Sequence, residues 1–317
     1  MTAALTEARF NDDTAAREHL EALRWPQGPV CPHCGGVERN SALAGESHRD
    51  GLYFCGDCRT QFTVTVGTVF ERSKVPLHKW VLATHLISAS KKGMSSKQLE
   101  RMLGVTYKTA WFMAHRIREA MTPKTTTGML GGGGAIVEAD ETFWGNSPRS
   151  KAGKAAVNKK ARRAFGSDHK MKVVSLVERG GQVRSFHVAN VTGKTLKRVL
   201  TSNIAADTRL MSDDAPMYRP IGRGFESHEV VKHSVKEYAR GDVTTNSVEG
   251  YFSILKRGLI GTFHHVGEQH LQRYVNEFDF RYNNRSALGV EDNQRTDNAL
   301  RGISGKRLTY RRTNAAA

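Results

Sequence analysis

The stretch AIVEADETFW, residues 135–144, decides the fold of the central part of this chain. Its residues alternate in polarity, so Ile136, Glu138 and Asp140 share one face of a β-strand. Further β-like stretches follow at MKVVSLVER, QVRSFHVAN, TRLMSD and HEVVKHS, with the helical stretch TGKTLKRVLTSNIA among them. Strands and helices in this order predict a mixed α/β domain with helices over the sheet.

Three acidic residues occupy positions where a metal site could form. Asp140 lies on that first strand, Asp213 ends the strand TRLMSD, and Glu249 begins the helix NSVEGYFSILKRGL. Side chains from two strand ends and a helix N-terminus can converge at one sheet edge and hold two Mg²⁺ ions about 3.5–4 Å apart. Mg²⁺ prefers carboxylate and water oxygens, as Mn²⁺ also does, and such an ion pair suits phosphoryl transfer at a DNA phosphodiester.

Each of these acids also has a simpler explanation. Asp140 could be a solvated strand end, and Asp214 competes with Asp213. Glu249 lies three residues after Asn246, as the acid of a helix capping box does. The spacing of the acids alone therefore leaves the metal site as one of two interpretations.

Basic residues flank the acids in the sequence. Lys256 lies two helical turns after Glu249, so the same helix face could hold a DNA phosphate, and Arg257 follows it. Between the first two strands, SPRSKAGKAAVNKKARRAFGSDHK has eight basic residues and one acid. We interpret it as an arm that becomes ordered on DNA, and a solvated loop is the alternative. The proposed contacts in this arm are Lys159, Lys160, Arg162 and Arg163.

The segment from Pro76 to Met121 contains three helical patterns. The second starts at Ser95 with Gln98 as a capping box and ends at Gly104, and Thr106 caps the third. Two helices joined by a glycine-containing turn predict a helix-turn-helix unit, which could place the third helix in a DNA major groove. A helical connector with a solvated basic face is the alternative. The outward face of the third helix is expected to consist of Tyr107, Lys108, Thr109, His115 and Arg116.

All four cysteines lie in two CxxC pairs, Cys31 with Cys34 and Cys55 with Cys58. Two such pairs can place four thiolates at the corners of a tetrahedron, the geometry of a closed structural Zn²⁺ site. Two disulfides or four free thiols are the alternative. His33 lies inside a complete CxxC and is expected to face solvent.

The net charge indicates what kind of partner the protein binds, and the distribution of apolar residues indicates where it is located. With 48 Lys and Arg against 31 Asp and Glu, the net charge is +17, which points to a polyanionic partner such as nucleic acid. No stretch approaches the roughly 18–20 apolar residues of a membrane span. The N-terminus lacks the features of an export signal, so a cytoplasmic, nucleoid-associated location is expected.

Shifts in composition divide the chain into five segments, with the Gly-rich stretch TPKTTTGMLGGGG as a flexible linker. We expect an N-terminal helix and zinc ribbon at 1–73, a helix-turn-helix domain at 74–124, a linker at 125–134, the α/β domain at 135–290, and a basic C-terminal tail at 291–317. The chain is expected to be loosely ordered from Arg285 onward.

Taken in chain order, these motifs resemble those of prokaryotic insertion-sequence transposases with a zinc ribbon, a helix-turn-helix and a DDE catalytic domain. The matching motifs are CPHCGG, FxCxxC, AWFMAHRIREAM, VEADETFWG, SDDAPMY, NSVEGYFSILKRG and HLQRYVNEFDFRYN. The resemblance covers roughly residues 10–290, and the ordered series is more specific than any single motif. It implies a ribonuclease-H-like mixed sheet with flanking helices, preceded by the zinc ribbon and the helix-turn-helix.

The resemblance also assigns roles to residues. It implies that Asp140, Asp213 and Glu249 form the DDE triad, with Lys256 as an accessory DNA-binding position. The family's second aspartate precedes a tyrosine by five residues, so Tyr218 selects Asp213 over Asp214. Thr245 departs from the family, which usually has His just before the Asn of the third motif.

The resemblance predicts the transposase of a mobile element. Such a protein binds double-stranded DNA at terminal inverted repeats and at a target, and it catalyses Mg²⁺-dependent cleavage and strand transfer. Bringing two element ends together requires at least a homodimer on DNA. A non-catalytic DNA-binding regulator with the same N-terminal modules is one alternative, and a structure-specific nuclease of the same fold is another.

Overall fold

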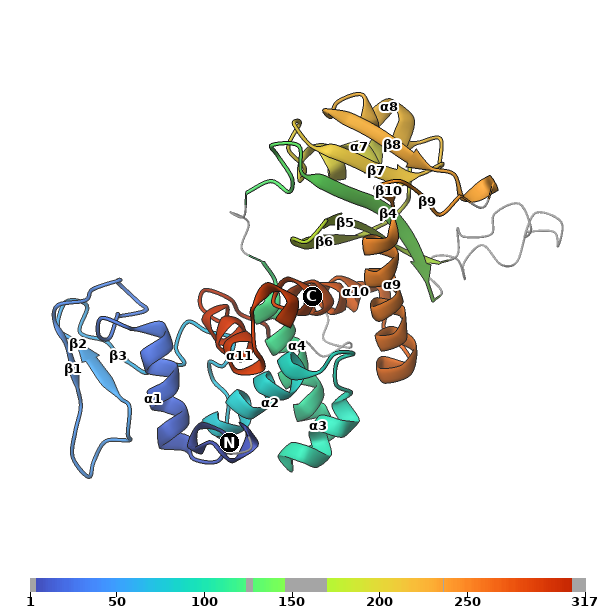
Figure 1. The fold of residues 1–317 in the computed structure, drawn as a ribbon. Helices are drawn as coiled ribbons and strands as arrows, with labels where there is room; N and C mark the ends of the chain where they lie inside the picture. Colours follow the sequence, from blue (N-terminus) through green and yellow to red (C-terminus); the bar gives the residue numbers. More distant parts are fainter. Residues whose placement is uncertain (1–3, 124–127, 146–169, 236, 310–317) are drawn as a thin grey trace, which may run out of the picture. The chain divides into compact units, whose positions relative to one another are not determined.

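The computed structural model describes residues 4–123, 128–145, 170–235 and 237–309. The chain forms two compact units (Figure 1). The first, which we call the discontinuous unit, combines Met1–Thr122 with Gly289–Ala317. The second, which we call the sheet unit, is Pro123–Leu288. No described helix is long and apolar enough to cross a membrane.

The discontinuous unit begins with short 3₁₀ turns, Ala4–Thr6 and Ala8–Phe10, and helix α1, Asp13–Arg24. Asp12 caps α1 by accepting a hydrogen bond from the Ala15 amide. A small antiparallel sheet follows, formed by β1 (Asn40–Ala42), β2 (Tyr53–Cys55) and β3 (Gln61–Phe62). After Phe62 the chain continues in turns, where the Thr68 hydroxyl donates to the Thr65 carbonyl.

Three helices follow and confirm the predicted caps. They are α2 (Leu77–Ala89), α3 (Ser96–Leu103) and α4 (Tyr107–Met121). Ser95 accepts a hydrogen bond from the Gln98 amide, and Thr106 accepts one from the Thr109 amide. Gly104 ends α3 in the left-handed conformation, with φ of 58°, which other residues rarely adopt. Helices α3 and α4 pack together as a helix-turn-helix pair.

The expectation of loose order after Arg285 is wrong for residues 286–301. The segment forms a 3₁₀ turn, Ser286–Leu288, and helix α11, Asp292–Arg301, which packs against α1, α2 and α4. Ala299 and Leu300 are fully buried, and Thr296 bonds His85 of α2. The sequence DNQRTDNALR has only two apolar residues, so its hydrophobic pattern is too weak to reveal the helix.

A five-stranded mixed sheet organises the sheet unit, in the order β6-β5-β4-β7-β8. The strands are β4 (Ile136–Trp144), β5 (Met171–Glu178), β6 (Val183–Val188), β7 (Arg209–Asp213) and β8 (Ser227–Val231). The first three pair antiparallel, whereas β7 pairs parallel to β4 and to β8. Three antiparallel strands extended by two parallel ones form the expected ribonuclease-H-like mixed sheet.

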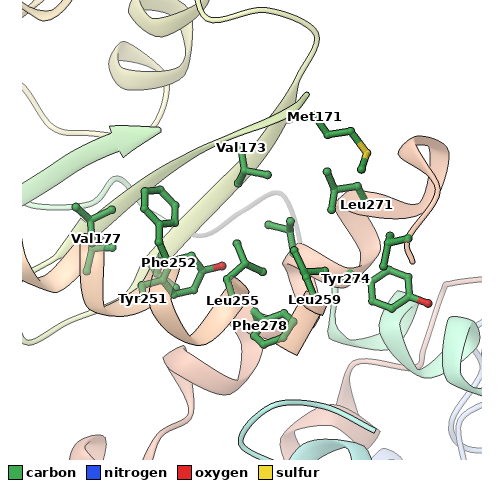
Figure 2. Close-up of a cluster of buried hydrophobic side chains, with 14 residues drawn as sticks. Met171, Val173, Val177, Tyr251, Phe252, Leu255, Leu259, Leu271, Tyr274 and Phe278 are labelled. Atoms are coloured by element: carbon green, nitrogen blue, oxygen red, sulfur yellow. The ribbon is translucent and has the colours of Figure 1, made fainter. Parts of the chain in front are cut away.

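Helices cover both faces of this sheet. They are α7 (Gly193–Thr201), α8 (Tyr218–Gly222), α9 (Asn246–Gly258) and α10 (Glu268–Asn283). The short hairpin β9 (Ala239–Arg240) and β10 (Val243–Thr244) precedes α9, and a π-helix, Leu259–Phe263, follows it. Val173 and Val177 of β5 pack against α9 and α10, as Figure 2 shows. Val174 and Leu176 point to the other face and pack against α7 and α8. The sheet therefore separates two cores.

Part of the predicted linker belongs to the sheet unit. Leu130 is buried in the core under α7 and forms a parallel bridge with Ile204. The amide of Gly133 donates to Asp207, which precedes β7. The domain boundaries inferred from composition stay a proposal.

Candidate active site and metal centre

The four cysteines lie together in the small sheet and its turns. Their sulfur atoms all lie within 4.8 Å of one another. The Cys31–Cys58 and Cys34–Cys55 sulfur pairs are both 3.6 Å apart, and all four thiols are free. A tetrahedron with Zn–S bonds of about 2.3 Å has sulfur atoms about 3.8 Å apart. The four thiols are therefore placed to bind a zinc ion, as predicted, rather than to form disulfides.

The four neighbouring thiols shift one another's pKa values in opposite directions. The Thr60 hydroxyl and the neighbouring thiols lower the pKa of Cys58 to about 7. The pKa of Cys34 is raised to about 12 despite the amide bond from Gly36, because burial and the other three thiols favour its protonated form. A cation at the centre would favour the thiolate form of all four. His33 is exposed, as expected for a residue outside the ligand set.

The N-terminal end of α4 presents two of the predicted DNA contacts. Tyr107 is exposed, and so is Lys108. The ammonium group of Lys97 lies 5.0 Å from the centre of the Tyr107 ring. The first residues of a recognition helix are those that reach base edges in helix-turn-helix proteins. These positions therefore remain suitable for DNA contact.

The expectation that His115 and Arg116 face outward is wrong. His115 is 1% exposed and Arg116 is 9% exposed. Arg116 donates hydrogen bonds to the carbonyls of Glu71 and Leu308, and its guanidinium lies 4.7 Å from the Phe112 ring centre. The C-terminal half of α4 is surrounded within its unit, so His115, Arg116 and Arg118 are all buried although they lie on different sides of the helix.

Asp140 and Asp213 lie side by side on neighbouring parallel strands. The last residue pair of the β4–β7 ladder is Ala139 with Ser212, and the two aspartates come next on their strands. Neighbouring strands are about 4.8 Å apart. Asp140 lies in the middle of β4 rather than at its end, because β4 continues along β5 to Trp144. Both aspartates lie on the α9 face, since Ala139 belongs to the core on the opposite face.

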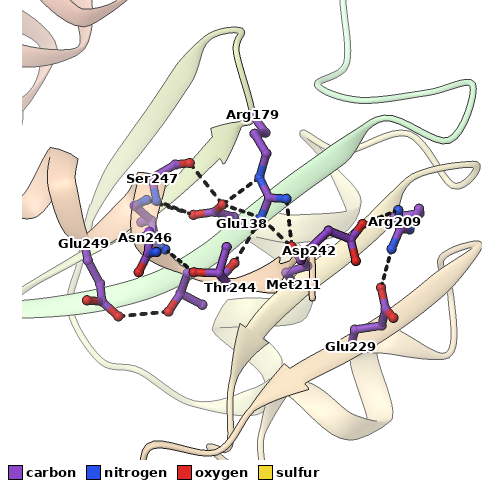
Figure 3. A network of polar contacts seen from close by, with 12 residues as sticks. Glu138, Arg179, Arg209, Met211, Glu229, Asp242, Thr244, Asn246, Ser247 and Glu249 are labelled. Carbon is purple, nitrogen blue, oxygen red and sulfur yellow. Dashed lines mark hydrogen bonds and ion pairs between the residues drawn. The ribbon is translucent and has the colours of Figure 1, made fainter. Parts of the chain in front are cut away.

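Glu249 reaches the same face from the first turn of α9 (Figure 3). The Thr245 hydroxyl donates a hydrogen bond of 2.9 Å to Oε1 of Glu249, and Nε2 of His233 lies 3.4 Å from the same oxygen. His233 comes from a 3₁₀ turn, His233–Val235, after β8. Sequence reasoning missed this histidine because it lies sixteen residues before Glu249 and outside any motif. Thr245 and His233 together orient the third acid.

The three acids influence one another electrostatically. Burial, together with the charges of Glu141, Asp213 and Glu249, raises the pKa of Asp140 to about 8. Burial also raises the pKa of Asp213, which the neighbouring charge of His233 lowers in part. Among the described residues, the four cysteines are the only group of three or more His, Cys, Asp or Glu side chains whose ligand atoms are close enough together to hold one metal ion. Mutually repelling carboxylates with oxygen donors alone suit a hard divalent cation.

A fourth acid, Glu141, lies next to Asp140 but points to the opposite face of the sheet. Its Oε2 accepts a hydrogen bond of 2.7 Å from the hydroxyl of Tyr218 on α8. Burial raises the pKa of Glu141, and the Tyr218 bond partly offsets this rise. Tyr218, five residues after Asp213, therefore has a structural role. Its hydrogen bond to Glu141 anchors β4, the strand that carries Asp140.

The remaining predicted DNA contacts fall into two groups. Lys256 and Arg257 are exposed on the last turns of α9, and Arg257 donates to the Ser253 hydroxyl. Lys159, Lys160, Arg162 and Arg163 lie outside the described residues.

Comparison with known proteins identifies the class. Residues 129–283 match the ISXO2-like transposase domain, and residues 11–61 match a transposase zinc-ribbon domain of the same group, IS1595. Together the two matches cover well over half of the chain. The fold, the cysteine centre and these matches define a transposase with a DDE-type domain. The chain carries the transposase domain and the zinc ribbon of the IS1595 group of insertion-sequence transposases.

Two individual proteins are similar to this chain. A protein of Halobacterium salinarum, described as an uncharacterized protein in transposable element ISH50, is 27% identical over 280 residues, covering 86% of this chain and 91% of its own length. A chain in the cryo-EM structure of the simian T-cell lymphotropic virus intasome with PP2A regulatory subunit B56 gamma has a TM-score of 0.29 and 11% identity. That match covers 58% of this chain and 63% of the intasome chain, and we draw nothing from so low a score.

Proposed function

We propose that this protein binds the ends of its own insertion sequence and catalyses divalent-metal-dependent cleavage and strand transfer of DNA. The observation that supports this most directly is the placement of Asp140, Asp213 and Glu249 on one face of the sheet, with Asp140 and Asp213 on adjacent strands. Membership of the transposase family makes DNA the substrate class.

Asp140, Asp213 and Glu249 would together hold two Mg²⁺ or Mn²⁺ ions. When bound, the ions activate the attacking oxygen and stabilise the leaving oxygen of an in-line displacement. Thr245 and His233 keep the Glu249 carboxylate oriented toward the site. Lys256 lies two turns further along α9 and exposed, where it would contact a DNA phosphate.

The reaction then has two displacements. In the first, a water oxygen bonds to phosphorus while the bond from phosphorus to a 3′ oxygen breaks. In the second, the oxygen of the freed 3′-hydroxyl bonds to a target phosphorus while the bond from that phosphorus to the target's own 3′ oxygen breaks, and the proton lost by the attacking hydroxyl is balanced by the one that the released 3′ oxygen takes up. The exposed start of α4, with Tyr107 and Lys108, would read the terminal repeats, and the basic arm with Lys159 and Arg162 would hold the backbone. The two ends of the element must be held in one complex, so the active form would be at least a dimer.

The test uses purified full-length protein with DNA that carries the inverted repeats flanking its gene. Asp140→Ala, Asp213→Ala and Glu249→Ala are each expected to abolish cleavage in Mg²⁺ while leaving end binding intact. Asp214→Ala is the matched control and should keep cleavage, because the Asp214 side chain bonds with Ser234.

Three outcomes would overturn the proposal. Binding without cleavage by the wild-type protein would favour a DNA-binding regulator. Cleavage without joining would favour a nuclease of the same fold. Full activity in any one of the three triad variants would remove that residue from the site.

A further inference from the structure

A fully buried carboxylate, Glu138, lies beside the proposed acids on β4. Its residue is 0% exposed. Its two oxygens accept five hydrogen bonds from Arg179, Ser247 and Val248. Figure 3 shows Arg179 and Ser247 directed toward this carboxylate. Glu138 and Asp140 are two residues apart on one strand, so their side chains lie on the same face.

Glu138 caps helix α9 from a distant strand. The N-cap residue, Thr245, makes no side-chain capping bond, and its hydroxyl donates to Glu249. Oε2 of Glu138 accepts the backbone amides of Ser247 at 2.7 Å and Val248 at 3.0 Å, and Oε1 accepts the Ser247 hydroxyl at 3.0 Å. A negative charge at a helix N-terminus is favourable, because unpaired amides and the helix dipole point toward it.

Arg179 compensates the buried charge and holds the turn before α9. Its Nε and Nη2 donate to Oε1 of Glu138 at 3.0 and 2.8 Å. The same guanidinium donates to the carbonyls of Asp242 and Thr244, on either side of Val243 in the strand that leads into α9. The carboxylate and the guanidinium therefore join β4, the β10 strand and the first turn of α9 into one hydrogen-bonded unit.

We propose that Glu138 is a positioning residue that fixes the separation of Asp140 and Glu249. A single residue of β4, Ala139, separates Glu138 from Asp140, and Val248 is the residue directly before Glu249. A shift of α9 along the sheet would have to break the two amide bonds to Glu138 first. This inference rests on the proposed function, because the separation of Asp140 and Glu249 matters only if the two acids hold the metal ions.

The experiment measures Mn²⁺ binding to the full-length protein by electron paramagnetic resonance, together with the thermal midpoint of unfolding. Glu138→Gln keeps the size of the side chain but turns one acceptor oxygen into an NH₂ group that faces the donors. We expect this variant to fold and its Mn²⁺ dissociation constant to rise at least tenfold. Ser247→Ala removes only the hydroxyl donor and keeps both amide bonds, so we expect a rise of two- to threefold.

Asp279→Asn is the matched control. Asp279 is a buried carboxylate of the same unit, and it accepts hydrogen bonds from the Ser185 amide and hydroxyl and from the Tyr251 hydroxyl. This change should lower the thermal midpoint but leave the Mn²⁺ dissociation constant within twofold of wild type. An equal loss of Mn²⁺ affinity in Asp279→Asn would show that general destabilisation, not positioning, weakens binding, and would overturn the inference.

Asp140→Ala separates this inference from the proposed function. If Asp140→Ala abolishes Mn²⁺ binding while Glu138→Gln binds as wild type does, the positioning role alone is wrong. If Asp140→Ala binds Mn²⁺ as wild type does, the metal site itself is wrong, and the positioning role is lost with it.

Discussion

The buried hydroxyl of Tyr218 holds the carboxylate of Glu141 at 2.7 Å on the face of the sheet opposite to Asp140. Adjacent residues of a strand point to opposite faces, and this bond keeps the two neighbouring acids apart. It also fixes the stretch of β4 that continues beyond its parallel pairing with β7.

Replacing Tyr218 with phenylalanine is expected to destabilise the sheet unit. The change keeps the ring but leaves the Glu141 carboxylate without its donor, at a cost of about 1–3 kcal/mol in the free energy of unfolding. Urea denaturation measures the loss. Tyr282→Phe is the control, because the Tyr282 hydroxyl has no hydrogen bond within the described ranges, and it should change the free energy by less than about 0.5 kcal/mol. Equal losses in both variants would contradict the role of the Tyr218 bond.

Removing the Asp140 charge is expected to change how stability depends on pH. The pKa of Asp140 rises from 3.8 to about 8 on folding, so the folded state binds the proton more tightly than the unfolded state. The free energy of unfolding therefore falls as pH rises between about 4 and 8. Asp140→Asn has no carboxyl group to ionise at this position, so this loss of stability disappears. At pH 8 the free energy of unfolding of the variant should exceed that of the wild type by on the order of a few kcal/mol.

Urea denaturation from pH 4.5 to 8.5 without added divalent ions measures this effect. The wild type and Asp140→Asn should have similar stability near pH 4.5 and diverge as the pH rises. Asp214→Asn is the control and should gain no stability at pH 8, because the Ser234 hydroxyl lowers the pKa of Asp214. Parallel curves for wild type and Asp140→Asn would refute the prediction.

One zinc ion is expected per chain, held by the four thiolates. Cys55→Ser removes a buried ligand and should reduce the zinc content of protein purified without added metal from one toward zero. Atomic emission spectrometry gives the stoichiometry. His33→Ala leaves all four sulfur atoms in place and should keep one zinc. Zinc-free wild-type protein would show that the thiols serve another purpose.

Lys256→Ala is expected to weaken DNA binding in a salt-dependent way. Losing one phosphate contact should reduce the slope of log affinity against log salt concentration by about 0.9 for duplex DNA. Fluorescence anisotropy at several salt concentrations measures the slope. Lys197→Ala is the control, because Lys197 is exposed on α7, which covers the opposite face of the sheet. If both variants change the slope equally, net charge rather than position explains the effect.

The sequence predicts most of the elements that carry the site. Alternation identified β4, capping residues located α3 and α4, and the CxxC spacing placed the thiols. These features depend on residues close together in the chain, so local propensity and spacing are sufficient to find them.

The features that escaped prediction depend on contacts between distant residues. The bonds from Ser247 to Glu138 and from Tyr218 to Glu141 join positions 109 and 77 residues apart. Neither periodicity nor a motif contains such information. The burial of Arg116 was missed for the same reason, since its partners, Glu71 and Leu308, come from remote segments.

Helix α11 belongs to the discontinuous unit but is synthesised after the whole sheet unit, and this sets the order in which the nascent chain can fold. Residues 123–288 emerge from the ribosome before Asp292–Arg301 does, and domains generally fold as units during synthesis. The acids can therefore be assembled while the helices that hold Tyr107 and Lys108 still lack a packing partner. A prematurely terminated chain would retain the sheet that carries the acids and lose part of the core behind the helix-turn-helix.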